Sequence, residues 1–404
     1  MSEPLKAFPG LIPPEKPRDR PLSAAMERLY DFWNPYEDRS NGLYSNFKYS
    51  RVTGIGKEPG VSRRDPSTVI KVGDTYYVWY TKRQTESEPV GLEAQSDTLP
   101  AVDWDLADIW YATSRDGFHW EEQGIAVARA PKGEYGDRFL STPSVPVYHG
   151  RYYLYYQTFT HRWELNDCVG MSMAWADSPD GPWHRLDRPV VPRGVVDEWD
   201  GCVIHDPFPL VYQGKIWLYY KGSPVDKSER ALIRAQGVAI ADKPEGPFIK
   251  SALNPVINSG HETCFFPFRE GIAAIVSLDG AEKNTIQYAP DGLSFEIKSI
   301  IQVPPVAPGP FCPDLFADNG NGRGITWGLC HIHPDDTSGK GGCFLACFDC
   351  DLSLDVHRPE FKRNNLRFHE DTYFQRGMIL PDSWRERILR EQARLDRETI
   401  MVKD

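Results

Sequence analysis

The stretch SRRDPSTVIKVGDTYYVWY (residues 62–80) contains the unit that decides the fold. A polar residue before proline opens this unit, and an apolar strand, a glycine turn and an aromatic strand follow. The unit recurs along the chain, with starts near residues 65, 142, 206, 262 and 314. The sequences at these starts are Asp65-Pro66, Thr142-Pro143, Asp206-Pro207, His261-Glu262 and Cys312-Pro313-Asp314. Five similar units favour a repeat architecture over a single β-sandwich.

A second landmark follows four of the five starts. RDGFHW (115–120), PDGPW (179–183), PEGPF (244–248) and PDGLSF (290–295) each place a glycine turn before an aromatic residue. We expect this aromatic side chain to pack between neighbouring sheets. Repeats of about 50–75 residues, each with roughly four short strands, are typical of propeller blades. The prediction is therefore an all-β fold, a five-bladed β-propeller with an N-terminal helical segment and a C-terminal helix.

The two ends of the chain lie outside the repeat. Residues 1–50 are expected to form an N-terminal helical extension, in which Ser23 caps a helix. Residues 51–380 would hold the propeller, and residues 381–404 a C-terminal helix that begins with a capping box from Ser383 to Glu386. Neither helix has a sheet of its own to cover, so each is expected to clamp the propeller or to pack against another subunit.

The composition excludes several kinds of partner. The 404 residues carry a net charge of −11 without a long basic run, which argues against nucleic acid and anionic membranes, since both require a positive face. No stretch is long and apolar enough for a membrane span. The proline-rich N-terminus lacks the apolar core of a signal peptide, which predicts a cytoplasmic protein, or a periplasmic one if a leader was trimmed.

Cysteine and histidine residues gather near the end of the repeat. Cys343, Cys347 and Cys350, with His331 and His333 nearby, are of the types that ligate zinc. The sequence lacks two complete ligand pairs, however, and CFLACFDC alternates like a strand, so the cysteines are expected to act as small apolar side chains. We predict no metal ligand and no cofactor, and the sequence leaves open a divalent cation in the channel.

The first strand of every propeller blade lines the central channel, so residues far apart in sequence are expected to converge there. Asp65, Asp206 and Glu262 would then share one pocket. Glycoside hydrolysis requires an acid and a base or nucleophile. Neighbouring carboxylates separate these two roles by shifting each other's pKa. The residues expected to bind a sugar are Arg64, Trp110, Thr142, Gln157, His161 and His205.

A structural role competes for each of these residues. An isolated aspartate before proline often only opens a turn, and a lone histidine is more often hydrogen-bonded than catalytic. Equivalent positions in two units, Asp65 and Asp206, with a third acid at Glu262, favour catalysis. A catalytic role is less favoured for Asp314, because its sequence context, Cys-Pro-Asp, is also typical of a turn.

The N-terminal Ser-x-Ala-x-x-Arg motif (Ser23, Ala25 and Arg28) and the blade starts SRRDPS, IHDPFP and GHETCFFPF resemble glycoside hydrolase family 117, the α-1,3-L-neoagarooligosaccharide hydrolases. The resemblance spans essentially the whole chain. It implies an inverting exo-hydrolase that releases 3,6-anhydro-L-galactose from the non-reducing end of agar oligosaccharides. It also implies a homodimer, in which the N-terminal helix carrying the motif is swapped between subunits.

The resemblance further implies a role for each residue at the blade starts. Asp65 corresponds to the general base that activates water, and Asp206 to the carboxylate that holds the substrate. His261 corresponds to the general acid with Glu262 as its partner, and the two roles exchange if Glu262 donates the proton. His369 corresponds to a histidine that the C-terminal region of a neighbouring subunit supplies near the active site.

Two alternatives stay open at this point. The same fold acts on other sugars, such as carrageenan-derived anhydrogalactose, arabinosides or xylosides, and fold alone does not choose between them. A non-catalytic glycan-binding propeller is a different class, which the three acids and His261 argue against. Inversion predicts carboxyl groups about 6.5–9.5 Å apart, and a spacing near 5 Å indicates retention.

Overall fold

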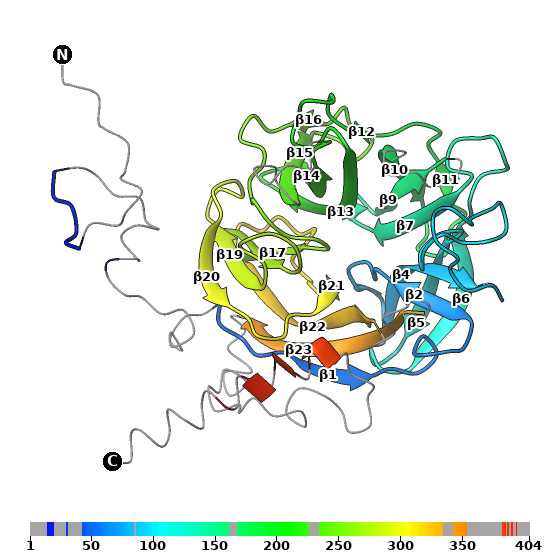
Figure 1. The fold of residues 1–404 in the computed structure, drawn as a ribbon, viewed down its shortest axis with the longest axis horizontal. Helices are drawn as coiled ribbons and strands as arrows, with labels where there is room; N and C mark the ends of the chain where they lie inside the picture. The colour runs from blue at the N-terminus through cyan, green and yellow to red at the C-terminus, as the bar shows by residue number, and fades with distance from the viewer. Residues whose placement is uncertain are drawn as a thin grey trace.

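The structure is a computed structural model that describes residues 43–84, 86–160, 168–225, 234–333 and 342–353, together with 14–19, 30 and several positions between 382 and 393. Its strands follow one another as antiparallel meanders arranged in a ring (Figure 1). Within these residues the strands form four hydrogen-bonded sheets, and the all-β propeller predicted from the repeat is confirmed. No helix in the described part of the chain is long and apolar enough to cross a membrane.

Successive strands group into five meanders along the described chain. The first contains β2 (Val61–Arg64), β3 (Ile70–Val72), β4 (Thr75–Gln84), β5 (Asp108–Ser114) and β6 (Trp120–Val127). The second contains β7 (Phe139–Ser144), β8 (Val147–Tyr148), β9 (Arg151–Phe159), β10 (Cys168–Ala176), β11 (His184–Arg185) and β12 (Val191–Pro192). The third contains β13 (Val203–Tyr212), β14 (Lys215–Ser223), β15 (Ala235–Ala241) and β16 (Ile249–Lys250), and the fourth β17 (Cys264–Arg269), β18 (Gly271–Val276), β19 (Thr285–Ala289) and β20 (Glu296–Ile300). The fifth contains β21 (Val306–Pro310), β22 (Gly322–Ile332), β23 (Phe344–Ser353) and β1 (Lys48–Arg51).

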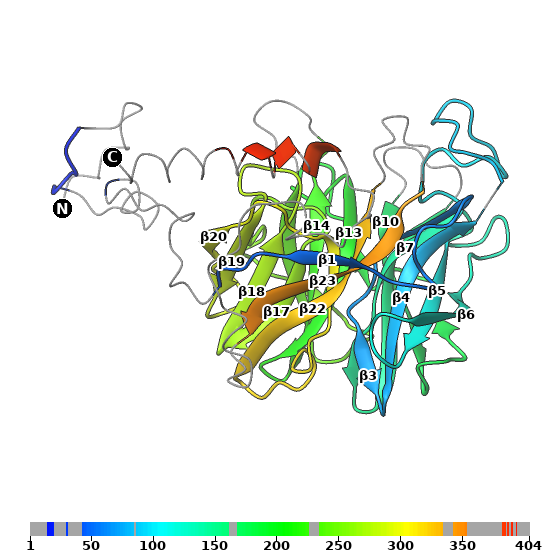
Figure 2. The ribbon, with the colours of Figure 1, turned by 90° about the horizontal axis from the view of Figure 1, so that it is seen from below.

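The ring is closed by a strand from the N-terminal side of the chain. β1 pairs antiparallel with β23 and is the outer strand of the fifth meander (Figure 2). The fourth and fifth meanders share one eight-stranded sheet, because β17 pairs with β22 at its end. The propeller strands thus begin at Lys48, slightly before the expected boundary at residue 51, and the division into three segments stays a prediction.

Aromatic side chains after the glycine turns join neighbouring meanders, as the sequence predicts. In each case the ring meets a ring from the second long strand of the preceding meander, in an edge-to-face arrangement that aromatic quadrupoles favour. The pairs are Trp183 with Trp79, Phe248 with Tyr155 and Phe295 with Tyr219, at ring-centroid distances of 5.9, 6.1 and 6.1 Å. These contacts fix the rotation of one meander against the next.

The C-terminal helix packs on the strand that closes the ring. Residues 382–384 are helical, so the helix begins before Ser383 and not with this residue as its cap. Trp384 is buried, and its ring centroid lies 5.3 Å from that of Tyr49 in β1. This helix therefore clamps the propeller, whereas Ser23, Ala25, Arg28 and His369 lie outside the described residues.

The fifth meander starts earlier than the sequence predicts. Its innermost strand is β21, and Ala307-Pro308 lines the channel at the position of Asp65-Pro66. Asp314 lies beyond this strand, where its carboxylate accepts hydrogen bonds from the Arg323 guanidinium and backbone. The expected start at residue 314 is wrong. Cys-Pro-Asp (312–314) has the composition of a repeat start, whereas the actual start, VAPGP (306–310), contains no polar side chain.

The innermost strands of the first and fifth meanders touch at Gly309. A Cβ at Gly309 would lie 2.0 Å from the Ser67 carbonyl oxygen, so only glycine permits this approach. We expect Gly309→Ala to lower the free energy of unfolding by about 3 kcal/mol, because the two segments must move apart.

Urea unfolding measures this loss, and Gly320→Ala is the matched control. A Cβ at Gly320 meets nothing within 4 Å, so only its left-handed backbone is strained. This strain costs about 1 kcal/mol. Equal losses in the two variants would show that the strand contact at Gly309 is unimportant.

Candidate active site

The starts of the five meanders share an unusual backbone conformation. Asp65, Thr142, Asp206, Glu262 and Ala307 have φ values of 51°, 49°, 54°, 57° and 48°. Residues other than glycine rarely adopt this left-handed region. The strand register shifts at the starts in β7, β13 and β21, as in a β-bulge, which redirects a side chain. These residues and those that follow them line one cavity of about 30 Å³. The structure thus brings Asp65, Asp206 and Glu262 together on one channel.

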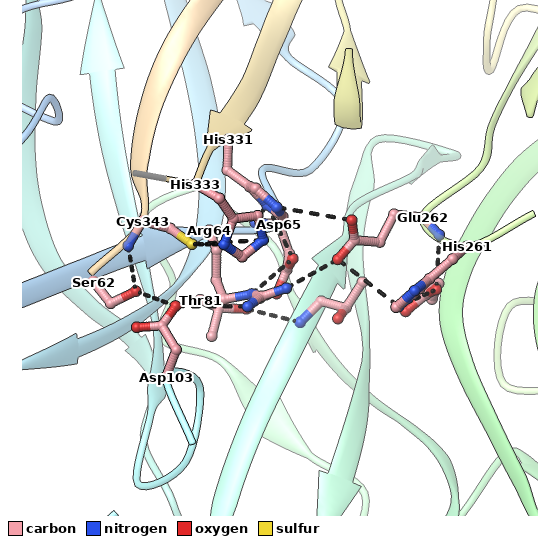
Figure 3. A network of polar contacts seen from close by, with 12 residues as sticks. Ser62, Arg64, Asp65, Thr81, Asp103, His261, Glu262, His331, His333 and Cys343 are labelled. Atoms are coloured by element: carbon pink, nitrogen blue, oxygen red, sulfur yellow. Dashed lines mark hydrogen bonds and ion pairs between the residues drawn. The ribbon is translucent and has the colours of Figure 1, made fainter. Parts of the chain in front are cut away.

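Arg64 lies buried between two of these acids (Figure 3). Its Nε is 3.1 Å from both carboxylate oxygens of Asp65, and its Nη2 donates to Glu262 Oε1 at 3.0 Å. Burial raises the pKa of Asp65, but Arg64 and His331 outweigh this effect and hold the pKa well below its usual range. Asp65 is therefore ionised at neutral pH. The third guanidinium nitrogen, Nη1, lies 3.6 Å from Asp103 Oδ2, so Arg64 also forms an ion pair on the side away from the two channel acids.

His331 contacts the same pair of acids from another side (Figure 3). Its Nδ1 lies 3.3 Å from Asp65 Oδ1, and its Nε2 lies 3.8 Å from Glu262 Oε2. A carboxylate oxygen of Asp65 and one of Glu262 are within 4.8 Å of each other. This distance is shorter than the spacing of about 6.5–9.5 Å between the acid and the base of an inverting glycosidase. Asp65 and Glu262 are therefore too close to be the acid–base pair of an inverting reaction.

Asp206 is held by a buried cation. Lys221 Nζ, from β14, lies 2.9 Å from Asp206 Oδ2, and the same oxygen accepts the backbone N–H of Glu262 at 3.0 Å. Burial raises the pKa of Asp206, but Lys221, followed by His261 and His205, lowers it to about 2. Asp206 is therefore an ionised acceptor at neutral pH, which suits it to hold a hydroxyl group and not to donate a proton.

His261 reaches the channel from beside Glu262. Its Nε2 lies 4.0 Å from Asp206 Oδ2 and 4.0 Å from Glu262 Oε1, and its Nδ1 lies 3.2 Å from Asp279 Oδ2. The side chain of His261 is 29% exposed, whereas those of Asp206 and Glu262 are 6% and 4% exposed. His261 is thus more open to an incoming ligand than either of the two acids that its Nε2 faces.

Three of the other residues expected to bind a sugar lie beside the acids. Thr142 lines the channel, Gln157 Oε1 accepts the backbone N–H of Asp206 at 3.3 Å, and His205 precedes Asp206 in β13. Burial, followed by the charge of Lys221, lowers the pKa of His205 well below its usual range, so His205 is neutral. Gln157 and His205 therefore support Asp206 in addition to any contact with a ligand.

Of the remaining two expected residues, Trp110 lies away from the cavity and His161 is outside the described part of the chain. Trp110 lies in β5, where Lys82 Nζ sits 3.6 Å from the centre of its ring, and it does not line the cavity between the starts. Successive side chains on a strand point to opposite faces of the sheet. The periodicity of β5 alone did not show which of its two faces meets the channel. His161 lies outside the described residues.

Sequence reasoning named Gln157 but missed Thr81 and Lys221, which also support the acids. Thr81 Oγ1 donates to Asp65 Oδ2 at 3.1 Å and accepts the backbone N–H of Thr142 at 2.9 Å. Thr81, Gln157 and Lys221 each follow directly after an aromatic strand sequence, YYVWY, YYLYY or IWLYY. They pair with Arg64, Ser141 and His205 in the preceding strands. The first polar residue after each aromatic run was therefore the available signal.

Two sets of described side chains have the composition to hold a metal ion. Asp65, Glu262 and His331 form one set, and His331, His333 and Cys343 form the other, with the ligand atoms of each set within 4.8 Å of one another. His333 is exposed, and its Nδ1 lies 3.1 Å from Cys343 Sγ. Cys347 and Cys350 lie in β23, where their Sγ atoms contact backbone carbonyls, and they belong to neither set.

The chain is similar to known proteins over most of its length. The solved structure of Zg3597, a family 117 glycoside hydrolase produced by the marine bacterium Zobellia galactanivorans, is 47% identical with a TM-score of 0.76. The match covers 82% of this chain and 98% of that chain. The chain belongs to glycoside hydrolase family 117. It is therefore an enzyme that hydrolyses glycosidic bonds.

Other glycoside hydrolases have a similar fold. The family model described as Glycosyl hydrolases family 43 matches residues 57–236. The catalytic domain of a Coprinopsis cinerea GH62 α-L-arabinofuranosidase is 9% identical with a TM-score of 0.52, over 78% of this chain and 99% of that chain. At this identity the likeness shows the fold alone. A comparison with curated proteins gives no match.

The buried ion pair of Lys221 and Asp206 is expected to stabilise the fold. We expect Lys221→Met to lower the free energy of unfolding at pH 7 by about 3–5 kcal/mol, because it leaves a buried carboxylate unpaired. The pKa of Asp206 is lowered in the folded state, so its stabilising contribution is present above the pKa of about 3.9 in the unfolded chain. The contribution is lost as the pH falls toward the folded pKa of about 2. The difference between the variant and the wild type should therefore shrink below about pH 4.

Urea unfolding at pH 7 and at a series of lower pH values measures this difference. Lys215→Met is the control, because Lys215 forms an exposed ion pair with Asp242 at 3.0 Å. An exposed pair contributes less than about 1 kcal/mol. A Lys221→Met variant no less stable than Lys215→Met would refute the assigned role of Lys221.

Proposed function

We propose that this enzyme is an exo-acting, inverting hydrolase of neoagarooligosaccharides that cleaves the α-1,3 linkage and releases 3,6-anhydro-L-galactose from the non-reducing end. One observation carries the proposal. Asp65, Asp206 and the His261–Glu262 pair meet at one channel in a member of family 117. These are the residues whose sequence context resembles the neoagarooligosaccharide hydrolases.

Asp65 is the general base in this proposal. A base must be ionised before it can accept a proton from water. Arg64, His331 and Thr81 all contact the Asp65 carboxylate, and the pKa of Asp65 is lowered as a result. Within the described residues, Glu262 Oε2 and His331 Nε2 have no hydrogen-bond partner, so a water molecule beside Asp65 has polar groups to orient it.

His261 is the general acid in this proposal. Glu262 is less suited to this role, because its Oε1 already accepts a hydrogen bond from the Arg64 guanidinium at 3.0 Å. Histidine has an unperturbed pKa near neutrality and donates from either ring nitrogen. His261 Nε2 faces the channel between Asp206 and Glu262, so this nitrogen is placed to protonate the leaving oxygen.

A retaining reaction is the second candidate, because one specific distance favours it. Oxygens of Asp65 and Glu262 lie within 4.8 Å of each other, near the spacing of about 5–5.5 Å found in retaining enzymes. In that reaction Asp65 would attack the sugar and Glu262 would donate the proton. The ion pair of Glu262 with Arg64 opposes this role, so the inverting assignment is the stronger one.

The narrow channel supports action on a chain end. Its cavity of about 30 Å³ lies between the five starts. This volume accommodates about one water molecule, so a polysaccharide chain cannot thread through it. A terminal sugar at the mouth of the channel, with the rest of the oligosaccharide pointing away, fits this shape.

A product assay tests the proposed substrate. We expect the purified enzyme to release 3,6-anhydro-L-galactose from neoagarobiose and to leave aryl arabinosides and xylosides intact. Asp65→Asn should lower kcat by at least about 1,000-fold, since it removes the base, with oligosaccharide binding preserved in calorimetry. Asp242→Asn, at an exposed ion pair, is the control and should retain full activity.

Two results would contradict this assignment. Release of an aryl pentose without release of anhydrogalactose would exclude the proposed sugar. Undiminished turnover in Asp65→Asn would exclude Asp65 as the base.

A further inference from the structure

His261 and Asp279 form a histidine–carboxylate pair that no role described above explains. Asp279 Oδ2 lies 3.2 Å from His261 Nδ1, on the side of the imidazole away from Nε2. Nε2 is the nitrogen that faces Asp206 and Glu262, at 4.0 Å from each. A proton on Nδ1 is therefore directed to Asp279, and the nitrogen on the channel side is the one that exchanges protons with a ligand.

The loop that carries Asp279 has an unfavourable backbone. Leu278 and Asp279, directly after β18 and Ser277, have φ values of 45° and 42°, and neither is glycine. Residues in this region of the backbone persist only where the surrounding structure holds them, and they gather at functional sites. Two hydrogen bonds hold this loop against the His261 segment: His261 N–H donates to the Ser277 carbonyl at 2.9 Å, and Gly260 N–H donates to the Asp279 carbonyl at 3.0 Å. The backbone therefore fixes Asp279 relative to His261.

The charges around His261 separate into two sides. Asp206 and Glu262 face its Nε2, with Lys221 bonded to Asp206, Arg64 bonded to Glu262 and neutral His205 next to Asp206. Asp279 faces Nδ1, and Arg234 Nε lies 3.9 Å from the same Asp279 oxygen. Of these carboxylates, Asp279 is the one at hydrogen-bond distance from the imidazole, and the hydrogen bond from His261 lowers the pKa of Asp279. Asp279 is thus an ionised acceptor for His261.

We propose that Asp279 is the positioning residue of the proton donor: its carboxylate accepts the Nδ1 proton of His261, holds the ring with Nε2 toward the channel and stabilises the imidazolium. This role rests on the proposed function of His261 as the general acid. In the reaction the Nε2–H bond breaks and an O–H bond forms on the leaving sugar as the glycosidic C–O bond breaks. Water adds to the anomeric carbon and gives its second proton to Asp65. His261 is left neutral with its proton on Nδ1, and exchange with solvent returns one proton to His261 and removes one from Asp65.

Asp279→Asn tests this role with little change in shape, since asparagine tolerates a left-handed backbone. We expect kcat on an oligosaccharide to fall about 100-fold with KM changed by less than about threefold. The variant removes the negative charge that faces Nδ1, so the alkaline limb of the pH–kcat profile should move to lower pH. Asp242→Asn is the control and should change neither quantity.

A comparison of leaving groups separates this role from a structural one. An aryl glycoside of the sugar that the wild-type enzyme hydrolyses has a leaving group that needs little protonation. Asp279→Asn should therefore retain most of its activity on the aryl glycoside while losing activity on the oligosaccharide. Equal losses on both substrates, or an unchanged alkaline limb, would overturn the proposal.

A measurement without substrate distinguishes failure of this proposal from failure of the proposed function. In the ¹⁵N NMR spectrum of neutral His261, the wild type should show the tautomer protonated on Nδ1, and Asp279→Asn should shift the population toward Nε2. This result is independent of which sugar the enzyme hydrolyses. A wild-type imidazole protonated on Nε2 in the neutral state would overturn the positioning role even if the enzyme releases anhydrogalactose.

Discussion

The buried guanidinium of Arg64 is the contact on which the chemistry of this active site depends. It lies between Asp65 and Glu262 and bonds to both at 3.0–3.1 Å. Without this charge, two carboxylates within 4.8 Å of each other would share a proton, because two buried negative charges at that distance repel. With it, each of the two acids has a buried cation as its partner. This leaves Asp65 as a base, removes Glu262 from the role of proton donor and assigns that role to His261.

The propeller supplies this arrangement through its backbone. Each meander begins with a left-handed residue at the channel, and in the first three meanders the next long strand contributes a polar residue beside it. Thr81 and Lys221 are such residues, and they bond to Asp65 and Asp206. The fifth meander has Ala307 at the equivalent position, so four side chains with polar groups and one methyl group surround the axis. The site is thus asymmetric because different residues occupy the same backbone position in the five meanders.

Much of this could be predicted from the sequence, for a physical reason. Proline after the left-handed residue marks Asp65 and Asp206 directly, whereas Glu262 precedes Thr263 and was found from its spacing to Pro267 and the turn at Gly271. The start at Ala307 was missed because Cys-Pro-Asp, a few residues later, carries the same mark without the same backbone. Lys221 and Asp279 were missed because their roles depend on pairing across strands and on a loop conformation, which local composition does not encode. The homodimer implied by Ser23, Ala25 and Arg28 stays a prediction, since these residues lie outside the described part of the chain.

The stereochemistry of the first product tests most directly whether Arg64 keeps Glu262 from acting as the acid. Time-resolved ¹H NMR of the hydrolysis shows which anomer of the released sugar forms before mutarotation. If Asp65 activates water and His261 donates the proton, the α-linked substrate should give the β-anomer first. Initial release of the α-anomer would show that Asp65 and Glu262 work as a retaining pair, and it would contradict this account.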